Sequence, residues 1–167
     1  MEKLDVRIVR LEPQRVASFH GFGSQPEEQA LEKLKAWAGP RGYLDDPGEH
    51  RIFGFNNPDP MPGSPNYGYE FWITVGPEVE QGGVTEGEPG GEMQLQDFPG
   101  GLYAVLRLDD PFAAPYEIIP GGWKQLVMWA EDSHYQLGSH QYLEEHLLQK
   151  VASSGGWSMD LYLPVKE

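Results

Sequence analysis

The chain has 167 residues, which is enough for one ordinary domain or for two small halves that share a core. Acidic residues outnumber basic residues by 26 to 12, and a formal net charge of −14 would repel a polyanion such as DNA. The absence of cysteine excludes disulfides, zinc–thiolate sites and cysteine nucleophiles, and it fits a reducing cytosol. We find no signal peptide and no apolar stretch of about 18 residues. We therefore expect a cytoplasmic protein that binds neither nucleic acid nor membranes.

The first half of the chain predicts the order strand, strand, helix, strand, strand. Apolar and polar residues alternate in Asp5–Leu11, with a shift of phase near Val9, a pattern typical of a half-buried strand. Pro13 predicts a turn, and Arg15–Gly21 is the second predicted strand. Ser24 is the predicted N-cap of a helix that ends at Gly39. The clearest strand is Tyr67–Val75, because all its odd positions are apolar. The predicted strands of this half are residues 5–11, 15–21, 51–55 and 67–75.

The second half predicts the same order after a connection rich in glycine and glutamate over residues 77–91. A loop is predicted over residues 111–122, because Pro115, Pro120 and a pair of glycines interrupt that segment. A helix is predicted over Trp123–Glu131, and a turn over residues 153–156. The predicted strands of this half are residues 93–98, 102–108, 142–148 and 157–165.

The two halves resemble each other in sequence as well as in the order of their elements. The segment YEFWITV at residues 69–75 is similar to MDLYLPV at residues 159–165, with an acid and an aromatic residue at equal places. We therefore predict an α+β fold made of two tandem β-β-α-β-β units, residues 1–76 and 92–167, joined by the linker 77–91. A pseudo-twofold axis would relate the units, and antiparallel sheets would leave a ligand groove where they meet.

Three segments follow a pattern that a known family shares. They are residues 128–147 with Trp129, Tyr135, Leu143 and Glu144, the closing segment WSMDLYLPV at residues 157–165, and Asn56–Pro58. The chain resembles the GyrI-like small-molecule-binding domains, which also form the effector-binding domains of AraC- and MerR-type multidrug regulators. The resemblance implies a tandem α+β architecture, a groove between the halves, and one central glutamate, Glu144, that faces hydrophobic and often cationic ligands. A strand begins near the N-terminus with no preceding helix-turn-helix, so we expect a stand-alone domain.

The adjacent acids Glu144 and Glu145 fall in one predicted strand. Successive strand residues point to opposite faces, so only one of the two can line a pocket. A carboxylate among apolar neighbours would be either an anchor for a cation or a general base acting on water. The resemblance favours Glu144, and the strand pattern alone leaves Glu145 as the alternative.

Aromatic residues of the strands are the candidate walls of the pocket. Trp72 shares a strand face with Glu70, and Tyr162 with Asp160 is the equivalent pair in the second half. Their rings would hold a flat or cationic ligand by stacking and by cation–π attraction, although aromatic residues in strands are ordinarily core. The predicted ligand-binding residues are Glu144, Trp72, Glu70, Phe53, Phe55, Phe22, Tyr103, Tyr142, Trp157 and Tyr162.

Metal and cofactor sites are not predicted. His134, His140 and His146 recur at equal intervals, but their spacing matches no known metal-binding motif. The sequence has no phosphate-binding glycine loop and no G-x-S-x-G nucleophile elbow. We therefore expect neither a metal nor a cofactor.

Three functions compete on these residues. The first is an effector- or multidrug-binding protein that captures hydrophobic or cationic small molecules. The second is a hydrolase of electrophiles such as isothiocyanates or strained-ring toxins, in which Glu144 activates water and Tyr103 or Tyr162 polarises the substrate. The third is a protein-interaction inhibitor of the DNA gyrase inhibitor type. The identity of the ligand, the occurrence of turnover and the choice between monomer and homodimer stay open.

Overall fold

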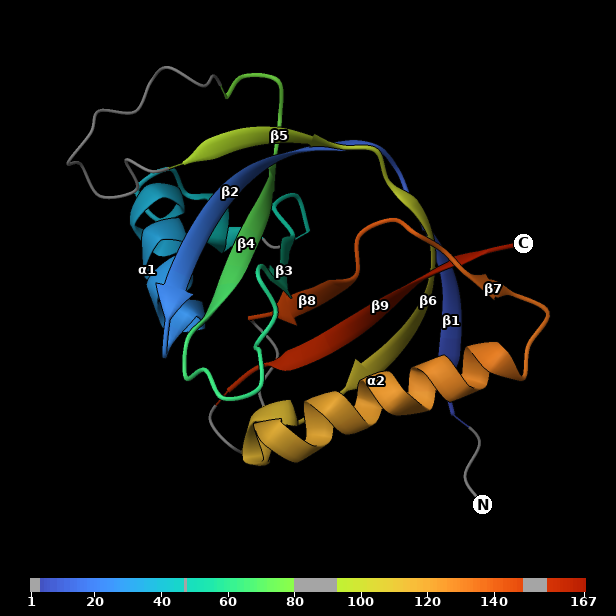
Figure 1. Cartoon of the computed structure of the whole chain (residues 1–167). Coiled ribbons are helices and arrows are strands. Elements are labelled where there is room, and N and C mark those ends of the chain that lie inside the picture. Colours follow the sequence, from blue (N-terminus) through green and yellow to red (C-terminus); the bar gives the residue numbers. More distant parts are fainter. Residues whose placement is uncertain (1–3, 47, 80–92, 149–155) are drawn as a thin grey trace. The chain divides into compact units, whose positions relative to one another are not determined.

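The computed structural model describes residues 4–46, 48–79, 93–148 and 156–167, and the chain divides into two compact units. The first unit contains Met1–Pro13 and Pro99–Glu167, and the second contains Gln14–Phe98. Each unit has an antiparallel sheet and one long α-helix (Figure 1). The predicted α+β class is therefore confirmed. Most of the predicted linker and turn, residues 77–91 and 153–156, lie outside the described residues.

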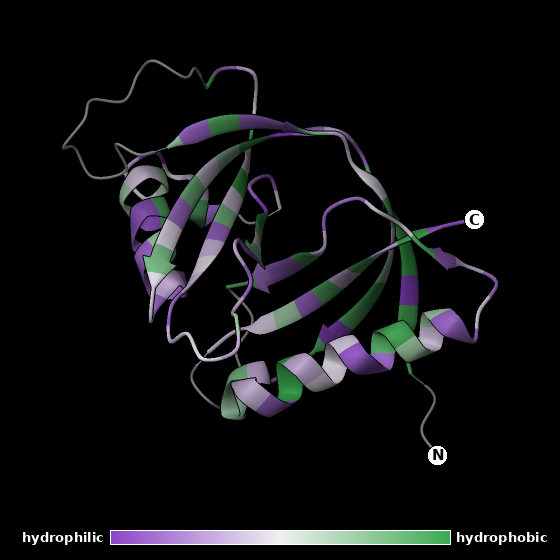
Figure 2. Ribbon diagram, in the orientation of Figure 1, coloured by the Kyte–Doolittle hydropathy of each residue, from purple (hydrophilic) through white to green (hydrophobic). Residues whose placement is uncertain are grey.

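The second unit is a four-stranded sheet in the order β3-β4-β2-β5. Its elements are β2 (Gln14–Gly23), α1 (Pro26–Ala38), the short 3-10 helix η1 (Tyr43–Asp45), β3 (Ile52–Asn56), β4 (Tyr67–Val75) and β5 (Gln94–Phe98). Bands of hydrophilic and hydrophobic residues alternate along β2 and β4 (Figure 2). This alternation gives the sheet two faces of different character.

Helix α1 covers one face of this sheet. Phe19 of β2 lies opposite Phe71 of β4 on that face, and both are buried. Trp37 of α1 packs against Phe19 with 5.8 Å between ring centroids. The residues between these in the strands, Glu70 and Trp72 among them, point to the other face.

The first unit is a sheet in the order β1-β6-β9-β8, with the short strand β7 paired to the end of β9. Its elements are β1 (Val6–Leu11), β6 (Gly101–Leu108), the 3-10 helix η2 (Pro111–Ala113), α2 (Pro115–Glu131), β7 (Gln136–Leu137), β8 (Leu143–Leu147) and β9 (Ser158–Lys166). Helix α2 runs along the face that carries Leu106 and Leu161, where Leu126 of the helix is fully buried (Figure 1). Arg107 and Asp160 point to the opposite face.

Two local predictions are wrong. Helix α2 begins at Pro115 rather than Trp123, so most of the predicted loop 111–122 is helical. Gly122 signals close packing rather than a turn, because a Cβ there would lie 2.9 Å from the Leu161 side chain. The N-cap of α1 is Gln25, which makes no capping hydrogen bond through its side chain, and not Ser24.

The turn between β5 and β6 depends on a glycine. Gly100 has a φ of +80°, and a Cβ there would lie 2.2 Å from the Leu11 carbonyl oxygen. We expect Gly100→Ala to destabilise the protein by several kcal/mol, because both the backbone conformation and the contact with β1 are violated. Gly42→Ala is the matched control, since its φ is +76° but no atom lies within 4 Å of the added Cβ. Urea unfolding should therefore give Gly42→Ala a loss of only about 1 kcal/mol, and equal losses in the two variants would contradict the steric argument.

Candidate ligand-binding site

Glu144 lies on the face of β8 that points toward α2. It is opposite Leu161 of β9, which belongs to the core beneath that helix. Its Oε2 accepts a hydrogen bond from Nε1 of Trp123, which lies on α2, over 3.3 Å. The ring of Tyr142 lies 5.8 Å from that of Trp123 and is 42% exposed. We call Trp123, Tyr142 and Glu144 the Glu144 cluster: a half-buried carboxylate that accepts a hydrogen bond from one aromatic side chain, which in turn packs against a second.

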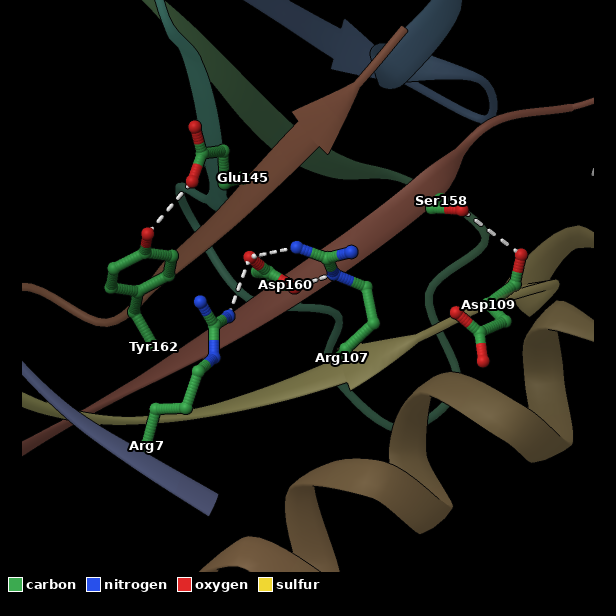
Figure 3. Close-up of polar contacts among 7 residues, drawn as sticks. All are labelled: Arg7, Arg107, Asp109, Glu145, Ser158, Asp160 and Tyr162. Carbon is green, nitrogen blue, oxygen red and sulfur yellow. Dashed lines mark hydrogen bonds and ion pairs between the residues drawn. The ribbon is translucent and has the colours of Figure 1, made fainter. Parts of the chain in front are cut away.

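Glu145 points to the opposite face, as strand alternation requires. It is buried, with 6% of its surface exposed, and its Oε1 accepts a hydrogen bond of 2.7 Å from the Tyr162 hydroxyl (Figure 3). The two adjacent acids therefore have different surroundings: Glu144 hydrogen-bonds to Trp123 on the α2 side, and Glu145 hydrogen-bonds to Tyr162 on the other side.

Asp160 lies directly opposite Glu145 on β9 and is the centre of an ion-pair network (Figure 3). Arg7 of β1 donates from Nη2 to its Oδ2 over 2.9 Å. Arg107 of β6 donates from Nη2 to Oδ2 over 3.2 Å and from Nε to Oδ1. The hydrogen bond with Asp160 raises the pKa of Arg107. Both guanidinium groups are therefore held by one buried carboxylate.

Tyr103 is also buried, but its hydroxyl is directed elsewhere. It donates a 2.6 Å hydrogen bond to the carbonyl oxygen of Gln141. Its ring packs against the edge of Tyr162, with 5.5 Å between centroids. Burial raises the pKa of Tyr103 well above its usual value, so the hydroxyl stays protonated. Tyr103 and Tyr162 are the two tyrosines predicted to act with a glutamate. Tyr162 hydrogen-bonds to a glutamate, which is Glu145.

The second unit contains another acid among aromatic rings. Glu70 is buried and accepts hydrogen bonds from four neutral side chains. The donors are Ser18 at 2.8 Å, Trp72 at 2.6 Å, Asn57 at 3.2 Å and Gln96 at 3.3 Å. Trp72 in turn packs edge-on against Phe55, with 4.9 Å between centroids. These neutral groups supply hydrogen bonds to both carboxylate oxygens.

The other predicted site residues are divided between the units. Phe53 is buried opposite Trp72, and Phe22 lies near the end of β2 with 55% of its surface exposed. Trp157 packs edge-on against Phe112 and donates from Nε1 to Nδ1 of His146 over 2.8 Å. Within the described part of the chain, no group of three or more histidine and acidic residues could hold a metal ion, and no helix is long and apolar enough to cross a membrane.

Sequence reasoning missed three residues of these sites. Trp123 was placed in a helix without a partner, and only the pairing of α2 with β8 brings it to Glu144. Arg7 and Arg107 come from strands far apart in the sequence, and their shared contact is with Asp160. The one available signal was that Arg107 is the single charged residue in the predicted strand 102–108.

A family model and a curated protein both match nearly the whole chain. A family model described as GyrI-like small molecule binding domain matches residues 4–166. A protein of Erwinia billingiae (strain Eb661) named DNA gyrase inhibitor is 26% identical over 177 residues, which cover 98% of this chain and 99% of that protein.

Solved structures share the fold at low sequence identity. The C-terminal domain of EcmrR is 16% identical with a TM-score of 0.62, over 98% of both chains. The EcmrR chain of a DNA complex is 17% identical with a TM-score of 0.63, and the match covers 98% of this chain but 57% of that one. A hydrolase from Listeria innocua is 12% identical with a TM-score of 0.62, over 99% of this chain and 94% of that one.

The buried imidazole of His146 should make stability depend on pH. Burial lowers its pKa from 6.5 to about 3. The unfolded chain therefore takes up a proton at higher pH than the folded chain, and the contribution of His146 is complete above about pH 6.5 and decreases as the pH falls toward 3. We expect the thermal midpoint of His146→Gln to fall less between pH 7 and pH 5 than that of the wild type. The exposed His134→Gln variant should retain the wild-type pH dependence, and an unchanged dependence in His146→Gln would contradict this assignment.

Proposed function

Because the chain belongs to the GyrI-like small molecule binding domain family, we propose that it captures hydrophobic, cationic small molecules at the Glu144 cluster. The observation that carries the proposal is the hydrogen bond between the half-buried Glu144 carboxylate and Trp123, next to the exposed ring of Tyr142. A carboxylate attracts positive charge, and the aromatic faces accept both apolar surface and a cation.

The chemistry of this cluster favours broad specificity. A cation over an aromatic ring contributes about 0.5–2 kcal/mol, depending on desolvation, and buried apolar area adds roughly 25 cal/mol per Å². Neither contribution requires a particular hydrogen-bond pattern in the ligand. One acid and two rings therefore select for positive charge and apolar bulk more strongly than for shape, which is the behaviour of a multidrug-binding protein.

Two ions of equal shape and opposite charge test the proposal. Tetraphenylphosphonium should bind saturably in isothermal titration calorimetry, and tetraphenylborate should bind more weakly. Glu144→Gln should reduce the affinity for the phosphonium by about tenfold, which is roughly 1.4 kcal/mol, because it removes the charge and keeps the shape of the side chain.

Glu131→Gln is the control for this experiment, since it removes the same charge from an exposed position at the end of α2. Its affinity for the phosphonium should stay close to that of the wild type. Equal losses in the two variants would assign the preference to the overall charge of −14 instead of Glu144. No saturable binding of either ion would refute the binding function at this cluster.

A second candidate function, hydrolysis of electrophiles, is supported by the pair formed by Tyr162 and Glu145, whose oxygens are 2.7 Å apart. Glu145 replaces Glu144 in the role of general base, because the tyrosine hydroxyl contacts Glu145. On an isothiocyanate, Glu145 would take a proton from water as the water oxygen bonds to the central carbon. The proton then passes to the nitrogen to give a thiocarbamic acid.

Loss of isothiocyanate absorbance at neutral pH measures this reaction. Glu145→Gln should reduce the rate at least about 100-fold, as expected for removal of a general base, and Glu144→Gln should retain most of it. A wild-type rate equal to that of buffer, or equal rates in wild type and Glu145→Gln, would exclude this activity.

We also propose that the two units are copies of one ancestral β-β-α-β-β unit. Each unit has the same strand order around one helix, and each has an acid and an aromatic residue two positions apart in an inner strand, Glu70 with Trp72 and Asp160 with Tyr162. In each unit one edge strand comes from the other predicted repeat: β1 pairs with β6, and β5 pairs with β2. Four expectations stay predictions: the pseudo-twofold axis, the ligand groove at the seam, the cytoplasmic location and the interaction of the gyrase inhibitor type.

A further inference from the structure

We propose that Arg7 and Arg107 form a receptor for the carboxylate group of a small organic anion, on the face of the first unit's sheet that α2 does not cover. Both side chains lie on this face around Asp160 (Figure 3). The site is separate from the Glu144 cluster, which lies on the α2 side. It would extend the ligands of this chain from cations to anions.

Among the described residues, only a few of the N–H donors of the two guanidinium groups have an acceptor. Each guanidinium carries five N–H donors, and Arg7 uses one on Asp160 while Arg107 uses two. Among the described residues Asp160 is the partner of both. The side chains of Arg7 and Arg107 are 47% and 32% exposed, whereas that of Asp160 is 4% exposed. The remaining donors are therefore accessible to an oxyanion from solution.

Asp160 also holds the Arg7 and Arg107 side chains in position. It lies directly opposite Arg107 on the neighbouring strand, and Arg7 reaches it from the edge strand β1. The bidentate contact with Asp160 has already restricted the rotation of the Arg107 guanidinium, and the single hydrogen bond of Arg7 restricts that side chain to a smaller extent. Binding a second carboxylate therefore costs less entropy than binding it to two unrestrained side chains. Arginine is suited to this role because its planar group matches the two oxygens of a carboxylate.

The charges around the site define its selectivity. Two guanidinium groups share one buried carboxylate, so an added anion relieves the repulsion between them. Glu145 and Asp109 also act on Arg107, and their negative charges oppose an anion there. Arg7, the more exposed of the two, is therefore the principal contact for the ligand, and a single carboxylate is favoured over a multiply charged anion.

Benzoate and its neutral isostere benzamide test the proposal. Chemical shifts of the arginine Nε–H groups should change saturably with benzoate and should change little with benzamide. Arg7→Gln should weaken benzoate binding about tenfold, which corresponds to the loss of one charge-assisted hydrogen bond. Arg107 retains its bidentate contact with Asp160 in this variant, so the fold should be kept.

Arg10→Gln is the matched control, because Arg10 is exposed on the same strand and points to the opposite face. It should bind benzoate like the wild type. Arg7→Lys keeps the charge without the planar group, and we expect an affinity between those of the wild type and Arg7→Gln. The proposal is overturned if the wild type shows no saturable benzoate response, if benzamide binds as well, or if Arg7→Gln and Arg10→Gln bind benzoate equally. Phosphonium binding at Glu144 should be unchanged in all three variants. Failure of the anion site can therefore be distinguished from failure of the cation-binding function.

Discussion

The antiparallel register of β9 with its neighbours β6 and β8 determines the chemistry of the first unit. It aligns Arg107, Asp160 and Glu145 in one row across three strands, and it aligns Glu144 with Leu161 on the other face. A shift of β9 by one residue in this register would place Asp160 in the apolar core beneath α2. The burial of Leu161 and Leu163 therefore fixes the positions of the acids, although these acids contribute nothing to that core.

The described acids of the two sheets differ in how their charge is compensated. Asp160 is paired with two arginines, Glu145 accepts from a tyrosine, and Glu70 accepts from four neutral donors. An ion pair balances charge, whereas neutral donors satisfy hydrogen bonding and leave the negative charge in place. The same residue type therefore creates a different local field at each position.

The sequence predicts the strands well because their alternation is local. Tyr67–Val75 is strand β4 at its predicted bounds. Strand β3 ends at Asn56 and strand β1 begins at Val6, each one residue from the predicted position. The start of α2 was not predictable in this way, since Pro115 is tolerated at the first helical position. Proline and glycine signals describe backbone preference, and tertiary packing against Leu161 overrides them at Gly122.

The candidate sites were predictable only in part. The resemblance names Glu144, and Tyr142 is among the aromatic residues predicted to bind a ligand. The pattern of β8 shows that Glu144 and Glu145 point to opposite faces, but it does not show which residue each contacts. Trp123, Arg7 and Arg107 enter the sites through contacts that are distant in sequence, 153 residues for Arg7 and Asp160. No local period encodes such contacts. They follow from strand order, which the sequence leaves undetermined.

The pairing of β1 with β6 has a consequence for the order of events during synthesis. The second unit is one continuous stretch, Gln14–Phe98, and it lies in the chain between β1 and the rest of the first unit. As the chain leaves the ribosome, this stretch can complete its own sheet while β1 still lacks the strand with which it pairs. β1 is therefore synthesised before this stretch but joins its sheet after it, because β1 waits for residues 101–106 to emerge.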